Sequence, residues 1–299
     1  MVDIPGTGAM PPVFSPGTRE RTLTPKQFDE ISYWSEIKLD IIKEYASAYS
    51  KILAAQSRPS LYHIYIDGFA GAGVHISRST GEFVSGSPLN ALSVRPEFKE
   101  YHFVDLDKAK ADSLRSLTKG RSDVKVYEGD CNTVLLSEVF PRARYKDYRR
   151  ALCLLDPYGL HLSWKVILTA GQMKSIDMFL NFPVADMNRN VLWRNPEGVP
   201  AGQVARMNAY WGDNSWRSVA YDTTRNLFGW EQKTDNDTIA QTFRKRLKDV
   251  AGFNYVPQPM PMRNSKGSVI YYLFFASQKP VAHHIVGQIF GTYRDRGVV

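Results

Sequence analysis

The sequence predicts an α/β fold in which a mostly parallel sheet of seven strands lies between helices and ends in an antiparallel hairpin. Five short apolar runs alternate with helix-like segments, which is typical of parallel strands covered on both faces. Two further runs flank Asn264-Ser265-Lys266-Gly267, a sequence suited to a tight turn. The seven runs span residues 62–66, 101–104, 124–127, 151–155, 178–181, 253–262 and 269–277.

The composition is that of a globular protein of a reducing compartment. Of the 299 residues, 43% are hydrophobic, enough for one large domain with an insertion. Neither cysteine, Cys131 or Cys153, has metal-ligand spacing around it, so we expect no disulfide and no metal site. The absence of a signal peptide and of an apolar run of roughly 18 residues predicts a cytoplasmic protein without a membrane span. The net charge of +8 favours an anionic partner such as nucleic acid.

The segments around this sheet have their own patterns. Residues 1–23, rich in proline and glycine, predict an extended arm before a domain over residues 24–299. Thr24 and Pro25 are a suitable start for a long amphipathic helix that ends near residue 55. Residues 186–235 predict a helical insertion that holds four tryptophans, and helices over residues 237–250 and from Pro280 follow. The four are Trp193, Trp211, Trp216 and Trp230.

A glycine-rich turn follows the first strand. Such a turn lets the backbone approach a ligand, and its free N–H groups suit polar or anionic atoms. A dinucleotide fingerprint would need a third glycine at position 76, which is Ile76, so an oxidoreductase is the weaker interpretation. The carboxylate before the glycines instead resembles the methyltransferase version of this turn, in which it helps to hold the amino-acid part of S-adenosylmethionine. The alternative is a glycine-rich turn without a ligand. We expect cofactor contacts from Asp67, Gly68, Phe69, Ala70, Gly71 and Gly73.

Acidic residues also end the second and third strands. Asp105 is placed to accept both ribose hydroxyls of a bound nucleoside. Asp107 either assists it or simply caps the following helix. After the third strand, Asp130 is placed to accept the adenine amino group, with Cys131 packed nearby. Three acidic strand ends in succession indicate a nucleoside site at the carboxyl edge of the sheet.

The fourth strand ends in Asp156-Pro157-Tyr158, which resembles the Asp-Pro-Pro-Tyr signature of methyltransferases that act on exocyclic amines of bases. In that signature the carboxylate and a proline carbonyl accept hydrogen bonds from the amine, and the aromatic ring stacks on the flipped base. Here one proline separates the two residues, which leaves the direction of the Tyr158 ring and the target atom open. A plain proline turn is the alternative. Asn181, on the next strand, is expected to complete the substrate pocket.

Three further features have two interpretations each. Lys38 lies one helical turn from Trp34, so it either reaches the active site or packs its stem along aromatic rings, and we favour the packing. Residues 142–150 interleave cations with aromatics, as either a phosphate-tracking surface or a solvated loop would. His283 and His284 are adjacent, so a helix would point them apart, which argues against a metal role.

Five blocks in order resemble the three-Cys-motif partner protein family over about residues 28–189. The resemblance implies a class I methyltransferase fold of the Rossmann-like type, with Asp67, Gly68, Gly71, Gly73, Asp105 and Asp130 at the cofactor and Asp156, Pro157 and Tyr158 at the reacting edge. It also implies a partner protein with a radical-enzyme-like three-cysteine motif. The blocks are Trp34 with Lys38 and Tyr45, residues 65–71, residues 86–92, residues 156–160 and Asn181-Phe182-Pro183.

Two hypotheses of function follow. The first is methyl transfer from S-adenosylmethionine to a nitrogen of a nucleic-acid base, either DNA or RNA. The second is a non-catalytic module that binds the cofactor or nucleic acid on behalf of the three-Cys protein.

Overall fold

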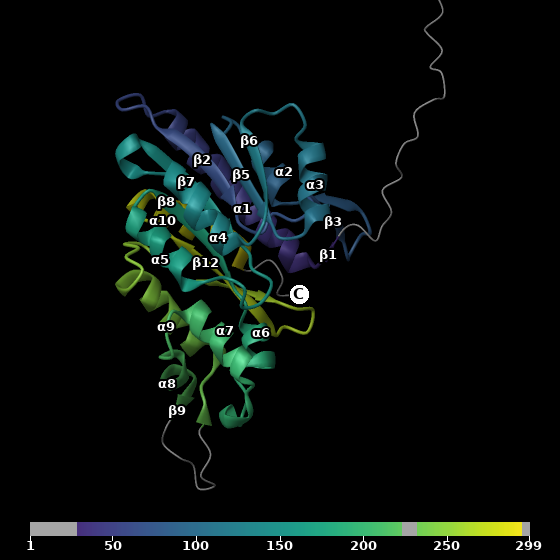
Figure 1. The fold of residues 1–299 in the computed structure, drawn as a ribbon, viewed down its shortest axis with the longest axis vertical. Helices are drawn as coiled ribbons and strands as arrows, with labels where there is room; N and C mark the ends of the chain where they lie inside the picture. The colour runs from purple at the N-terminus through teal and green to yellow at the C-terminus, as the bar shows by residue number, and fades with distance from the viewer. Residues whose placement is uncertain (1–28, 223–231, 295–299) are drawn as a thin grey trace, which may run out of the picture.

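The structure is a computed structural model that describes residues 29–222 and 232–294. Its main sheet has seven strands in the order β6-β5-β2-β7-β8-β12-β11, and β12 runs antiparallel to both of its neighbours (Figure 1). This is the Rossmann-like class I methyltransferase arrangement, so the predicted fold class is confirmed. The strands are β2 (Tyr62–Asp67), β5 (Glu100–Asp105), β6 (Val124–Glu128), β7 (Arg149–Leu155), β8 (Ile176–Phe182), β11 (Met260–Arg263) and β12 (Val269–Ala276).

Helices cover both faces of this sheet, and each face has its own apolar core. Strand β7 shows why: its side chains alternate, so that Leu152 and Leu154 enter one core and Cys153 and Leu155 the other. The first core is closed by α1 (Tyr33–Ala54), α2 (Ser87–Leu92), α3 (Lys108–Leu117) and α10 (Pro280–Arg294). The second is closed by α4 (Cys131–Val134), α5 (Trp164–Met173), α6 (Val184–Asn190), α7 (Ala201–Trp211), α8 (Trp216–Ala220) and α9 (Asn236–Asp249).

Shorter elements complete the described chain. Strands β1 (Glu30–Ile31), β3 (Val74–Ser77) and β4 (Phe83–Ser85) form a small sheet, and β9 (Tyr221–Asp222) pairs with β10 (Gln232–Lys233). A π-helical turn η2 (Leu135–Val139) and the 3-10 turns η3 (Phe140–Arg142), η4 (Tyr145–Asp147) and η5 (Pro196–Gly198) lie in the connections. The tryptophan-rich region is therefore helical from α6 to α8, whereas Trp230 lies outside the described residues.

Two predicted elements begin or end elsewhere. The helix expected from Thr24 begins at Tyr33; Thr24, Pro25 and the predicted arm over residues 1–23 lie outside the described residues. Residues 30–31 form β1 instead, because Asp29 and Ile31 carbonyls accept N–H groups from Ile76 and Arg78 beside β3. The strand expected over residues 253–262 is also mostly wrong.

The sheet pairing of that segment begins at Met260, so residues 253–259 lie outside the strand except for one bridge between Tyr255 and Ser277. Pro257, Pro259 and Pro261 occupy alternate positions, a pattern that an edge strand tolerates, and only Pro261 lies within β11. The predicted hairpin turn is confirmed by hydrogen bonds from the Gly267 N–H to the Asn264 carbonyl and from the Asn264 N–H to the Ser268 carbonyl.

Candidate active site

The glycine turn after β2 is tied to the end of β5 by a carboxylate. Gly71 and Gly73 have φ angles of +67° and +86°, in the left-handed region that favours glycine. The Gly71 N–H donates to Oδ2 of Asp105 at 2.8 Å, and the Asp107 N–H donates to Oδ1 at 2.8 Å. Asp105 is largely buried, so its carboxylate fixes the turn against the second strand.

Asp67, the last residue of β2, is completely buried beside this turn. Its Oδ1 accepts the Phe69 N–H at 3.2 Å, and the nearby Ser87 hydroxyl lowers its pKa, although Oδ2 makes no hydrogen bond of ordinary geometry within the described residues. Burial raises the pKa of Asp67 to about 7, and the carboxylates of Asp156 and Asp105 act in the same direction. A buried acceptor with a free lone pair is a ready partner for a cationic or N–H donor.

Asp156 follows β7 and is held by two side chains from distant parts of the chain. Its Oδ2 accepts from the Lys38 ammonium of α1, and its Oδ1 accepts from the Asn181 amide of β8 at 2.8 Å. The Lys38 ammonium also lies 5.3 Å from the ring centroid of Tyr271 on β12. Burial opposes the charge of Lys38, yet the attraction of Asp156 raises the pKa of this ammonium above its ordinary value. The ammonium of Lys38 is therefore charged at pH 7.

A cavity of about 260 Å³ brings the glycine turn and Asp156 together. Seven of the predicted site residues line it: Phe69, Ala70, Gly71, Asp156, Pro157, Tyr158 and Asn181. The other six are not on its wall: Asp67, Gly68, Gly73, Asp105, Asp130 and Cys131. The cavity thus joins the predicted reacting edge to the middle of the predicted cofactor turn.

Several of the six residues off the wall have clear structural roles. Asp130 caps α4, since its Oδ1 accepts the Thr133 N–H at 3.0 Å. Cys131 packs against Gly68: a Cβ at position 68 would lie 2.9 Å from its Sγ. Asp107 caps α3 by accepting from the N–H groups of its first turn, which is the simpler of its two interpretations. Contacts of Asp130 and Cys131 with a nucleoside stay predictions.

Tyr158 stands at the rim of the cavity and is 62% exposed. Its hydroxyl donates to Oδ2 of Asp29 at 3.2 Å, and the Lys110 ammonium lies 5.4 Å from its ring centroid. Lys110 also donates to the same Asp29 oxygen at 2.6 Å. The ring is therefore accessible and lines the same cavity as Asp156.

Sequence reasoning missed several residues of this cavity. The favoured interpretation of Lys38, packing along aromatic rings, covers only part of its contacts, because its ammonium lies over the Tyr271 ring and also pairs with Asp156. His75, Ser87 and Tyr271 also line the cavity, and only the order of β12 in the sheet brings Tyr271 there. Burial, helped by the charge of Lys38, lowers the pKa of His75, so this ring is neutral at pH 7.

The remaining sequence features lie away from this cavity. Residues 142–150 precede or begin β7, whereas Asp156 follows the last residue of the same strand. His283 and His284 are both exposed on α10. Within residues 29–222 and 232–294, no group of histidine, cysteine, aspartate and glutamate side chains is arranged to hold a metal ion. In the same ranges, every helix is too short or too polar to cross a bilayer.

Comparisons with known proteins give structural neighbours only. No family model and no curated protein sequence matches this chain. A Legionella pneumophila protein of the DUF519 family superposes with a TM-score of 0.48 at 12% identity, covering 87% of this chain and 93% of its own. A candidate methyltransferase from Thermobifida fusca gives 0.40 at 15% identity, covering 85% of each chain. The resemblance to the three-Cys-motif partner family stays a prediction.

Proposed function

We propose that this chain is an S-adenosylmethionine-dependent methyltransferase that transfers the methyl group to an amino nitrogen of a nucleic-acid base. The observation that carries the proposal is the position of Asp156. Its carboxylate opens into the same cavity as the glycine turn and is held from two sides by Lys38 and Asn181. A carboxylate oriented in this way is suited to receive an N–H donor next to a bound methyl donor.

The residues around the glycine turn fit this cofactor chemically. Asp67 is buried beside the turn, and a cofactor ammonium held at the turn would favour its charged form and offset part of the cost of its burial. Asp105 accepts one N–H on each oxygen, and each carboxylate oxygen has a further lone pair for a ribose hydroxyl. Leu106 is 74% exposed although apolar, and a flat adenine ring would cover it.

Charge also favours a cationic cofactor. Asp67, Asp105 and Asp156 lie at the carboxyl ends of the neighbouring strands β2, β5 and β7, and the ammonium of Lys38 pairs with Asp156. The pKa of Asp67, about 7, leaves it partly protonated at pH 7, and a cationic ligand would favour its charged form. S-adenosylmethionine has two positive centres and one carboxylate, and when bound it supplies an electrophilic methyl group. The excess of carboxylates therefore suits it better than a pyrophosphate, which this edge would repel.

The reacting edge is suited to an amine. An exocyclic amine has two N–H donors, and Asp156 Oδ1 and the Pro157 carbonyl are acceptors in succession along one turn. Accepting both N–H groups would localise the nitrogen lone pair and leave it free to point toward the methyl donor. Asp156 then holds the proton that the amine loses. Tyr158, exposed at the rim, presents a ring on which the base would stack.

The test separates cofactor binding from transfer. Isothermal titration with S-adenosylmethionine is expected to show binding by the wild type and by Asp156→Asn. Transfer of labelled methyl to total DNA or RNA is expected only with the wild type and with Asp249→Asn, an exposed control on α9. Mass spectrometry of the nucleosides then identifies the methylated atom.

Each contrary outcome has one meaning. Absence of binding at millimolar S-adenosylmethionine overturns the cofactor, and tight NADH binding would favour an oxidoreductase. Cofactor binding without label in DNA, RNA or protein, even with the three-Cys companion present, would indicate the non-catalytic module. Methyl on carbon or oxygen would overturn the role given to Asp156.

A further inference from the structure

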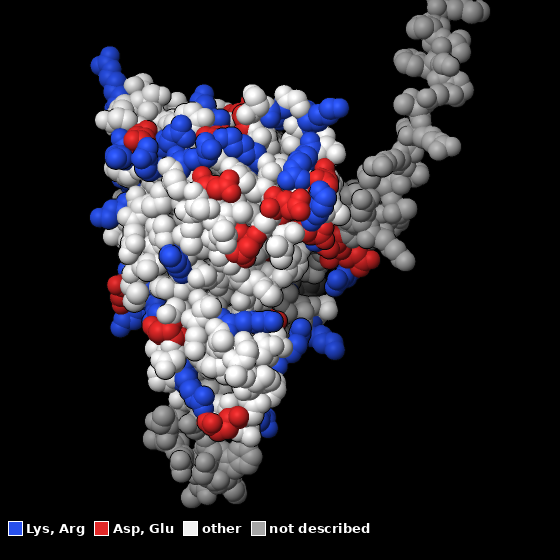
Figure 2. All heavy atoms as spheres, in the orientation of Figure 1, with Lys and Arg blue, Asp and Glu red and all other residues white. Residues whose placement is uncertain are grey.

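A second charged region lies at the other end of the main sheet. Arg149 and Arg150 begin β7, whereas Asp156 follows its last residue, so about 23 Å of extended strand separates the two ends. The turns η3 and η4 precede β7, and Lys125 lies near the start of β6. Figure 2 shows a band of Lys and Arg side chains across the top of the molecule, at this end of the sheet. We define the rear basic surface as Lys125, Arg142, Arg144, Lys146, Arg149 and Arg150.

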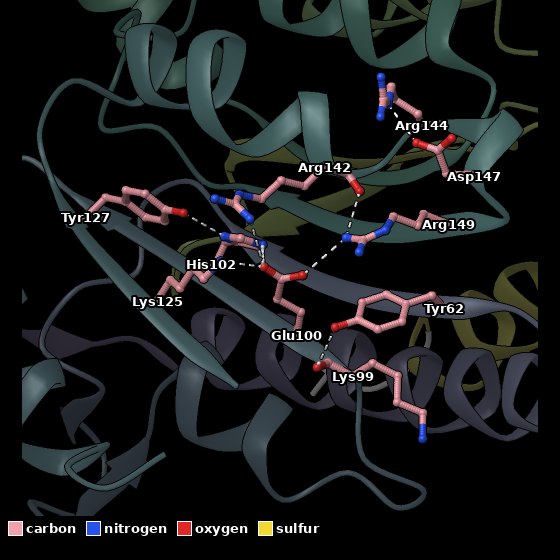
Figure 3. Close-up of polar contacts among 10 residues, drawn as sticks. All are labelled: Tyr62, Lys99, Glu100, His102, Lys125, Tyr127, Arg142, Arg144, Asp147 and Arg149. Atoms are coloured by element: carbon pink, nitrogen blue, oxygen red, sulfur yellow. Dashed lines mark hydrogen bonds and ion pairs between the residues drawn. The ribbon is translucent and has the colours of Figure 1, made fainter. Parts of the chain in front are cut away.

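Four of these six cations pair with two carboxylates. Glu100 is almost buried and pairs with Lys125 at 2.9 Å, Arg149 at 3.3 Å and Arg142 at 3.7 Å (Figure 3). Asp147 pairs with Arg144 at 2.7 Å. His102 also contacts Glu100, but burial lowers its pKa to about 4, so the ring adds no charge at pH 7. Two carboxylates cannot neutralise six cations, and the surface keeps an excess of positive charge.

The cations are fixed and accessible at the same time. Arg142 and Arg144 side chains are 44% and 57% exposed, and Arg149 is 31% exposed. The Arg149 guanidinium lies 4.3 Å from the Tyr62 ring centroid, and that of Arg150 lies 3.7 Å from the Tyr145 centroid. Stacked guanidinium groups keep their outward N–H donors free for phosphate oxygens.

Aromatic rings stand among these cations. Tyr145 and Tyr148 are 45% and 54% exposed. Tyr148 has a φ of +55°, uncommon for a bulky residue, and its carbonyl accepts the Tyr62 N–H at 3.0 Å. The turn that presents the two rings is therefore bonded directly to the start of β2. Rigid rings alternating with cations are the surface that single-stranded nucleic acid uses, because bases stack while phosphates pair.

We propose that the rear basic surface binds a single-stranded segment of nucleic acid, with bases on Tyr145 and Tyr148 and phosphates on the surrounding cations. An acidic protein would meet the charge but would leave the exposed rings without a matching flat group. The site anchors nucleic acid at a distance from the reacting edge, and as an anchor for substrate it rests on the proposed function. Binding itself requires no methyl transfer, so it can be measured without cofactor.

The test measures binding of a fluorescein-labelled 20-nucleotide single-stranded RNA, and of its DNA equivalent, by anisotropy without S-adenosylmethionine. The variant Arg144→Glu/Lys146→Glu is expected to bind at least tenfold more weakly. Removing two phosphate contacts should also lower the slope of log K against log salt by about 1.4. The control Lys245→Glu/Lys248→Glu reverses two exposed cations of α9 and is expected to bind within twofold of wild type.

A second variant tests the rings. Tyr145→Ala is expected to weaken oligonucleotide binding about tenfold, because stacking is lost, while leaving heparin binding unchanged. Equal effects of the two charge-reversal pairs would overturn the proposal, and so would an unchanged oligonucleotide affinity of Tyr145→Ala. Binding to phosphatidylserine vesicles but not to oligonucleotides would assign the surface to membranes instead.

Failure of the nucleic-acid-binding proposal is distinguishable from failure of the proposed methyltransferase function. Arg144→Glu/Lys146→Glu leaves the cavity at the opposite edge intact, so its affinity for S-adenosylmethionine should equal that of wild type. If the protein binds oligonucleotides through this surface but does not bind S-adenosylmethionine, the nucleic-acid-binding proposal stands and the methyltransferase proposal is wrong.

Discussion

The buried ammonium of Lys38 forms an ion pair with the carboxylate of Asp156, although 118 residues separate the two in the chain. The pair joins α1 to the end of β7 and sets the orientation of the carboxylate on which the proposed chemistry depends. Its side chains are 9% and 27% exposed, so water compensates only part of the loss if one partner is removed.

We expect Lys38→Met to lower the free energy of unfolding by about 2 kcal/mol, less than for a fully buried pair because Asp156 keeps some solvent. A double-mutant cycle with Asp156→Asn, followed by urea denaturation, should give a coupling energy of about 1 kcal/mol or more. The matched cycle is Lys110→Met with Asp29→Asn, a more exposed pair, for which we expect about 0.5 kcal/mol. Equal coupling energies in the two cycles would contradict the prediction that the more buried Lys38–Asp156 pair is the stronger one.

The buried carboxyl of Asp67 makes stability depend on pH. Its pKa in the folded chain, about 7, lies above the unfolded value, so the folded chain binds more protons between these two values. Stability should therefore fall as pH rises from about 4 to about 7. Replacing Asp67 by Asn removes this contribution, and urea denaturation at a series of pH values should give a flatter profile.

Asp177 is the control for this pH profile, since burial also raises its pKa, to about 6. Asp177→Asn should flatten the profile as well, but mainly below pH 6. If Asp67→Asn and the wild type had the same dependence of stability on pH, the pKa of Asp67 would be the same in the folded and unfolded chains, which would contradict this prediction.

The two glycines of the turn differ in their surroundings. A Cβ at Gly73 would lie 2.9 Å from Leu114 Cδ2, whereas at Gly71 the nearest atom, on His75, is 3.8 Å away. Both have positive φ, so alanine at either position costs roughly 1–2 kcal/mol of backbone strain. Gly73→Ala should cost about 1–3 kcal/mol more through crowding of the core. Thermal unfolding of the two variants measures the difference, and equal stabilities would show that Leu114 yields freely.

Two aspartates only two residues apart should have different effects. Asp105 accepts the N–H of the glycine turn, and Asp107 caps α3. Asp107→Ala should cost about 1 kcal/mol of stability, as caps do, and leave the affinity for S-adenosylmethionine unchanged. Asp105→Ala should weaken that affinity at least tenfold, because it frees the turn and removes the ribose acceptor. Calorimetry on both variants decides this, and equal affinities would remove Asp105 from the cofactor site.

Much of the fold could be predicted because its signals are local. A short apolar run between helical segments indicates a strand covered on both faces, because its length and its hydrophobic pattern can be read from consecutive residues. The prediction for residues 253–262 failed in its first part, because Pro257, Pro259 and Pro261 are compatible with an edge strand but do not fix the residue at which its pairing begins. The glycine turn and the acidic strand ends were found in the same way, from consecutive residues.

The amino-acid sequence by itself therefore determined where most of the main-sheet strands lie along the chain, that a glycine turn follows the first of them, and that carboxylates follow or end several of them. The tertiary structure alone decided that the Lys38 ammonium pairs with Asp156 and lies over the Tyr271 ring. It also decided that Asp105 faces the Gly71 N–H. The reason is that hydrophobic period is a property of adjacent residues, whereas the partner of a buried charge depends on which elements the packed sheet brings together.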